Sequence, residues 1–130
     1  MSLRNKRRIK CWDFVIEVPL YNSSIKITFT TNVDLYLTSI GQSEETGLGT
    51  VAIMLGDCQE EGLHLIFPKG ADVPTLVHEA THAAINIAGA HDILPTPEHD
   101  EAFAYLLENI VKQLIECKKV ATRKANRKGL

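Results

Sequence analysis

A chain of 130 residues with 45% hydrophobic and 23% charged side chains has the composition of one globular domain, 1–130, rather than of a disordered or fibrous protein. No apolar run approaches the about 18–20 residues of a membrane span, and the basic first ten residues lack the apolar stretch of a signal peptide, so we expect no membrane partner. Three widely spaced cysteines form neither a disulfide framework nor a zinc knuckle, which favours free thiols in a reducing, cytoplasmic setting.

Charge is segregated along the chain. All sixteen acidic residues lie between Asp13 and Glu116, where three lysines accompany them, so this central body has a net charge of −13 and the residues on either side carry +11. The basic tails, about residues 1–10 and 119–130, could bind nucleic acid. No aromatic residues are interleaved with them as a stacking platform requires, so we expect solvated, frayed ends. The sequence leaves the oligomeric state open.

The first half of the chain is typical of β-structure. Residues 12–20 and 24–31 alternate apolar and polar side chains, and the turn-forming residues between them predict a hairpin. Residues 33–40 favour a short helix or irregular structure, and residues 41–49 form a polar, glycine-bearing loop. Two short apolar runs, 51–55 and 63–67, predict a second antiparallel pair.

The pattern then changes to helical periodicity. Residues 75–88 predict a helix with Asp72 at its N-terminal cap and Gly89 at its C-terminal cap. A second helix is expected over 97–118, with Thr96 as its cap. The fold class is therefore expected to be α+β, a single small domain in which an antiparallel sheet is followed by two helices.

The first of these helices contains the motif His78-Glu79-Ala80-Thr81-His82, the pattern HExxH. Residues four apart lie on one face of a helix, so His78 and His82 can bind one metal ion. These residues share a narrow polar stripe with Thr75 and Asn86, on a helix that is otherwise apolar. Unpaired buried polar groups are costly, so the stripe needs a partner, and Zn²⁺ is the ion that this motif typically binds. The alternative is two core histidines satisfied by hydrogen bonds, and Thr75 and Asn86 could either orient the ligands or cap the helix.

Catalytic zinc typically has three protein ligands. The glycine and third histidine of the longer metzincin motif are absent, so the third ligand is expected from a later helix. Glu101 is the preferred candidate, followed by His99 and Glu108, and the alternative for Glu101 is a solvated carboxylate favoured by the helix dipole. His64 and His91 are expected to be ordinary surface histidines or to support the ligands rather than bind the metal.

The segments 75–82 (TLVHEATH) and 100–105 (DEAFAY) resemble the gluzincin branch of zinc peptidases, in particular the short single-domain minigluzincins, some of which are carried by phages. The resemblance covers about residues 50–115. It implies a zincin-like fold, with His78, His82 and Glu101 as zinc ligands and Glu79 as the general base. It also implies that residues 63–67 form an edge strand, along which a peptide is laid by strand addition.

We therefore expect a hydrolase, a zinc-dependent metallopeptidase that acts on a peptide or protein substrate. In this mechanism Glu79 takes a proton from a zinc-activated water and passes it to the leaving amine. Tyr105, His91 and His99 are candidates for the group that stabilises the oxyanion. The alternative is a zinc-binding interaction module without proteolytic activity, because a chain of this size has little room for substrate pockets.

Overall fold

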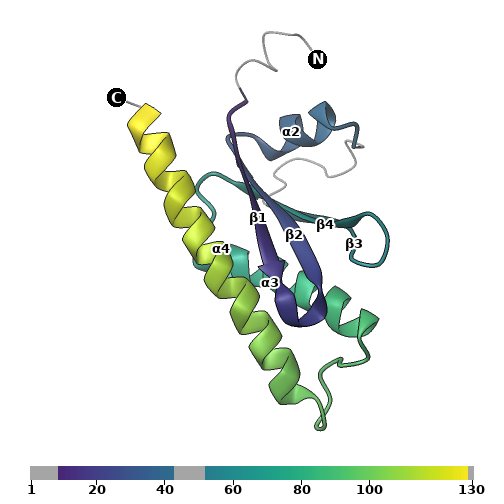
Figure 1. Cartoon of the computed structure of the whole chain (residues 1–130). Helices are drawn as coiled ribbons and strands as arrows, with labels where there is room; N and C mark the ends of the chain where they lie inside the picture. Colours follow the sequence, from purple (N-terminus) through teal and green to yellow (C-terminus); the bar gives the residue numbers. More distant parts are fainter. Residues whose placement is uncertain (1–8, 43–51, 129–130) are drawn as a thin grey trace.

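The computed structural model describes residues 9–42 and 52–128. These residues contain four strands and three α-helices, with a 3₁₀ turn after the first strand and one helix between the second and third strands (Figure 1). Their bounds are β1 Cys11–Val18, the turn Pro19–Tyr21, β2 Ser23–Thr30, α2 Val33–Ser39, β3 Ile53–Asp57, β4 Gly62–Pro68, α3 Val73–Ala90 and α4 Asp100–Lys128. The α+β class is confirmed, as is the short helix near residues 33–40. The loop expected over 41–49 lies mostly outside the described residues.

The four strands form one sheet in the order β1-β2-β4-β3. The two expected hairpins are present, because β1 pairs with β2 and β3 pairs with β4 in antiparallel register. The hairpins join through β2 and β4, which run parallel, with Phe29 opposite Phe67. The sheet is therefore mixed and not wholly antiparallel. An alternating pattern states which side chains share a face, but it leaves the direction of the neighbouring strand open.

Among the described strands, the edge that α3 contacts is β3, so the expectation that residues 63–67 form the edge is wrong. These residues belong to β4, which lies between β2 and β3. Leu65, Ile66 and Phe67 are fully buried in succession, because both faces of β4 are covered. The opposite edge, β1, is shielded by α4, whose Gln113 side chain donates a hydrogen bond to the Glu17 carbonyl at 2.7 Å. Figure 1 shows α4 lying as a long rod alongside β1.

The two faces of the sheet pack against different helices. One face and the helices α3 and α4 enclose the main core, in which Phe29 and Phe67 stack with ring centroids 5.4 Å apart. On the other face, α2 buries Tyr36 and Leu37 against Ile66. Helix α3 lies against the part of the sheet that contains β3 and β4. None of the described helices is long and apolar enough to cross a lipid bilayer.

The helix ends differ from the sequence expectations in three places. Asp72 caps α3 as expected, but the helix continues through Gly89 to Ala90, and Asp92 takes the left-handed conformation with φ of 57°. The Thr96 carbonyl accepts the His99 N–H at 2.9 Å within a separate turn, so α4 begins only at Asp100. The described helix α4 extends to residue 128 and does not fray from residue 119, because Ala121 still packs in the core.

Candidate metal site

Helix α3 carries the HExxH motif, with His78 and His82 on its exposed side and Glu79 and Ala80 buried. Its buried face consists largely of small residues, which lets the helix lie close to the sheet and to α4: Leu76, Ala80, Ala83, Ala84, Ile87 and Ala88. The Asp72 carboxylate accepts hydrogen bonds from the Thr75 hydroxyl at 2.6 Å and from the Thr75 N–H at 3.0 Å. These bonds lower the pKa of Asp72. The Thr75 hydroxyl is therefore held by the Asp72 cap and does not orient a histidine.

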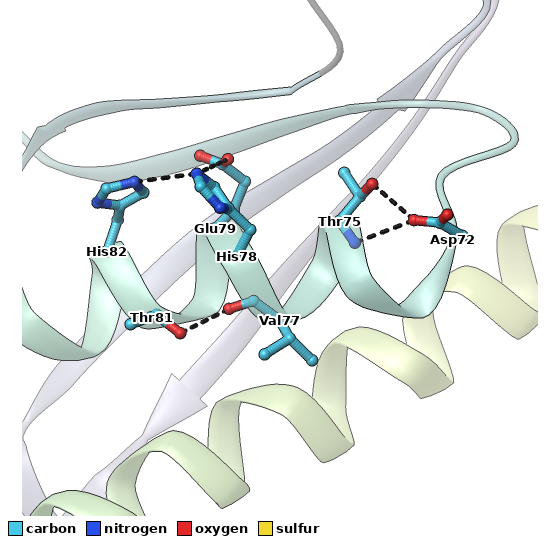
Figure 2. Close-up of polar contacts among 7 residues, drawn as sticks. All are labelled: Asp72, Thr75, Val77, His78, Glu79, Thr81 and His82. Atoms are coloured by element: carbon cyan, nitrogen blue, oxygen red, sulfur yellow. Dashed lines mark hydrogen bonds and ion pairs between the residues drawn. The ribbon is translucent and has the colours of Figure 1, made fainter.

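The two imidazoles of the motif are already arranged as a pair. The Nε2 atoms of His78 and His82 are 3.3 Å apart, and the ring planes make an angle of 74° (Figure 2). Zinc–imidazole bonds of about 2.0–2.1 Å at tetrahedral angles place the two nitrogen atoms about 3.3–3.4 Å apart. The separation therefore matches that of two imidazole ligands on one tetrahedral Zn²⁺, and a hydrogen bond between the two rings satisfies the same distance.

Glu79 completes the cluster from a more protected position. Its side chain is only 8% exposed, whereas that of His78 is 69% exposed. The Glu79 Oε2 atom lies 3.7 Å from Nε2 of His78, and the potential ligand atoms of His78, Glu79 and His82 all lie within 4.8 Å of one another. If the imidazoles held a metal ion, a carboxylate at this range could accept a proton from a water bound to it. An open cleft of about 420 Å³, lined in part by Thr75, His78 and Glu79, leads to it.

In the described structure, Glu101 does not belong to the cluster of His78, Glu79 and His82. Val73 at the start of α3 and Lys118 of α4 line the same groove, so the two helices run antiparallel and the first turn of α4 lies toward the far end of α3. The eight residue steps from His82 to Ala90 alone span about 12 Å of helix. Glu101 is exposed in that first turn. It stays a predicted ligand, and its binding requires the first turn of α4 to move toward the imidazoles.

The other candidate ligands lie elsewhere. Glu108 forms an ion pair with Lys112 at 3.1 Å and lines a groove beside the β1–β2 turn. His99 is exposed in the turn before α4, and His91 at the end of α3 packs on the Tyr21 ring with centroids 5.1 Å apart. Tyr105 lines the same groove as Glu108. Neither residue therefore lies in the cleft beside His78 and Glu79.

Two polar residues have roles that the sequence did not predict. His64 is half-buried and lies apart from the imidazole pair, with its Nε2 atom 2.8 Å from the Thr28 hydroxyl on the α2 side of the sheet. Asn86 binds the β3–β4 turn, as its Oδ1 atom accepts the Cys58 N–H at 3.0 Å. Both contacts join residues far apart in sequence. The polar stripe on α3 singled out Asn86 in the sequence, but it did not identify the turn that Asn86 binds.

Comparisons of the chain with protein-family models, with curated proteins and with solved structures found no match. The case for a metal site therefore depends on the spacing of the imidazoles and the position of Glu79.

Proposed function

We propose that this protein is a zinc-dependent peptidase in which His78 and His82 hold Zn²⁺ and Glu79 acts as the general base. The observation that carries the proposal is the 3.3 Å separation of the two Nε2 atoms, with a protected carboxylate beside them. Bound zinc would lower the pKa of a water toward about 7 and polarise a peptide carbonyl. The family resemblance adds Glu101 as the third ligand.

Glu79 and the edge strand β3 would carry out proton transfer and peptide binding. Glu79 accepts the proton of the attacking water and delivers it to the amine that leaves, a role that its partial burial and its 3.7 Å contact with His78 support. The peptide lies along β3, which is the sheet edge that α3 contacts and which has no second strand partner among the described residues. Main-chain hydrogen bonds to such an edge hold an extended substrate with little dependence on its sequence.

The variant Glu79→Gln tests this assignment. It keeps the shape of the side chain and both imidazoles, so we expect it to bind one equivalent of Zn²⁺ with unchanged affinity and to lose cleavage by a factor of at least about 10². Zinc titration by calorimetry and cleavage of an unfolded protein substrate measure the two properties. Glu108→Gln is the matched control, because this glutamate lies in a different groove.

Three results separate the readings. Zinc bound by the wild-type chain without cleavage of any peptide favours the alternative, a zinc-binding interaction module. Equal activity of Glu79→Gln and the wild type removes Glu79 from the mechanism. If the protein takes up no zinc, and His82→Ala changes nothing but stability, the imidazole pair is only a hydrogen bond between two rings.

A further inference from the structure

The amide of Asn86 fastens the β3–β4 turn to α3. Its Oδ1 atom accepts the backbone N–H of Cys58 at 3.0 Å, and its Nδ2 atom donates to the Asp57 carboxylate at 3.3 Å. The Cys58 thiol also lies 3.7 Å from the backbone carbonyl oxygen of Asn86. One side chain therefore satisfies both a turn N–H and a carboxylate that are 28 and 29 residues away in sequence.

The turn itself is built around Asp57. One carboxylate oxygen accepts the Gln59 N–H at 2.8 Å, and the Asp57 carbonyl accepts the Glu60 N–H at 3.1 Å. The second carboxylate oxygen is the one that Asn86 binds. Asp57 is also the last residue of β3 and pairs with Gly62 at the start of β4. The Asn86–Asp57 contact thus fixes the end of the edge strand, and not merely a loose loop.

Asn86 lies one helical turn after His82 on the same stripe of α3. Four residues of a regular helix separate the two positions by about 6 Å along the axis, and the buried alanines beneath them hold that helix firmly. The clamp and the imidazole pair therefore belong to one rigid element. Whatever holds β3 to Asn86 also sets the gap between the edge strand and the metal.

We propose that Asn86 and Asp57 form a positioning pair, which sets the distance between the substrate-binding edge of β3 and the zinc site and so determines how tightly extended peptides bind. This inference rests on the proposed peptidase function. A pair that only stabilised the fold would affect short and long substrates alike. A pair that sets the gap affects substrates long enough to lie along β3 and spares those that contact the metal alone.

The charge arrangement of the pair gives a sharp test. Asn86→Asp sets a second carboxylate against Asp57, and Asp57→Asn can set one amide nitrogen against another. In the double variant, the amide introduced at position 57 can accept from Gln59 and donate to the carboxylate introduced at position 86. Every hydrogen bond is then restored, and only the one between positions 57 and 86 has its polarity reversed. We expect each single variant to weaken binding of an extended peptide by roughly ten-fold or more, and the double variant to recover most of that loss.

Binding is measured with zinc-loaded protein that also carries Glu79→Gln, so that the peptide of about eight residues is not cleaved. Zinc affinity is measured for each variant and is expected to stay unchanged. In the background with Glu79 intact, KM for the extended peptide rises in the single variants while kcat/KM for a dipeptide stays constant. Asn86→Ser, which shortens the side chain without adding charge, replaces Asn86→Asp if that variant does not fold.

Equal affinity of all four proteins for the extended peptide, with zinc retained, would overturn the inference and leave the peptidase function standing. A loss that is the same for the dipeptide and the extended peptide also overturns it, since that is the result of a purely structural contact. If wild-type protein binds zinc and no peptide of any length, the proposed function fails and the inference falls with it.

Discussion

A single turn of helix positions most of the proposed metal site. His78 and His82 need only the four-residue spacing and their exposed face to bring two nitrogen atoms to 3.3 Å. Glu79, one residue further on, is rotated toward the sheet and loses most of its solvent contact. In the proposed site, the same backbone would leave the two imidazoles accessible to an ion and would give Glu79 a drier setting, in which its interaction with a bound water is stronger.

The third ligand is tested by Glu101→Ala. Because the family resemblance assigns this carboxylate to the metal, we expect its loss to weaken zinc binding by about ten-fold or more. The measurement is a competition titration against a chromophoric zinc chelator. Glu108→Ala is the control, since Glu108 is paired with Lys112 outside the cleft, and it should leave the affinity unchanged.

Unchanged zinc affinity in Glu101→Ala would mean that the arrangement of the described residues persists when the metal binds. In that case two imidazoles are the protein ligands from α3, and Glu101 is the solvated first-turn carboxylate that its exposure suggests. A loss of affinity shared by both variants would instead indicate a general effect of removing negative charge.

Residue patterns predicted what a helix determines locally. The pairing of His78 with His82 and the capping by Asp72 follow from contacts within four residues, and both are present. The role of Asn86 depends on a turn 28 residues earlier, and that of His64 on a strand 36 residues earlier. No local period encodes such partners. The sequence showed that these side chains are polar positions among apolar ones, and the fold supplied the reason.

At the scale of elements, strand positions were predictable and strand order was not. Alternation located the first hairpin and two short apolar runs located the second, and the helix that separates them was expected as one alternative. The uninterrupted apolar run of β4, Leu65 to Phe67, is typical of a strand covered on both faces, but the family resemblance led us to expect an edge strand there. The edge is β3, whose half-buried residues alternate less clearly.

The β3–β4 hairpin depends on a close approach of two glycines. Gly56 has φ of 87°, and a Cβ atom there would lie 2.1 Å from the Gly62 carbonyl oxygen. Gly62 has nearly the same φ, 85°, but open space around its Cα atom. Gly62→Ala should therefore cost about 1–2 kcal/mol of unfolding free energy for the left-handed backbone alone. Gly56→Ala should cost roughly a further 1–3 kcal/mol, because the carbonyl must move.

Urea denaturation of the two variants measures this difference directly. Since the hairpin also carries the edge strand, Gly56→Ala should reduce peptide cleavage at a temperature where the protein is still fully folded. Equal destabilisation by the two substitutions would show that the hairpin adjusts to a side chain at residue 56, and that the close approach is not a constraint.

A network of polar side chains lies on the face of the sheet that α2 covers, opposite the proposed metal site on α3. Thr28 donates its hydroxyl hydrogen to Asp13 at 2.6 Å, so it must accept from the Nε2–H of His64 at 2.8 Å. The Tyr36 hydroxyl lies 3.5 Å from the same oxygen atom. This network joins β1, β2, β4 and α2, and it ties the parallel strand pair together where the two hairpins meet.

His64 makes the stability of the fold depend on pH. Burial, helped by the positive charge of Lys26 and opposed by Asp13, lowers the pKa of His64 from 6.5 to about 4. Between these pH values the unfolded chain binds a proton that the folded chain does not bind. The unfolding free energy is therefore full above about pH 6.5 and falls as the pH is lowered toward 4. His64→Gln keeps an amide donor for Thr28 and cannot titrate, so the part of this decrease due to His64 should disappear.

Urea midpoints measured from pH 7 to pH 4.5 in the presence of a chelator follow this effect without interference from metal binding at α3. The carboxylates titrate in both proteins, so the difference between wild type and His64→Gln isolates the histidine. His99→Gln, at an exposed position before α4, should follow the wild-type curve. Parallel curves for wild type and His64→Gln would show that His64 binds its proton equally well in both states, and that the network with Thr28 and Asp13 opens to solvent in acid before the sheet unfolds.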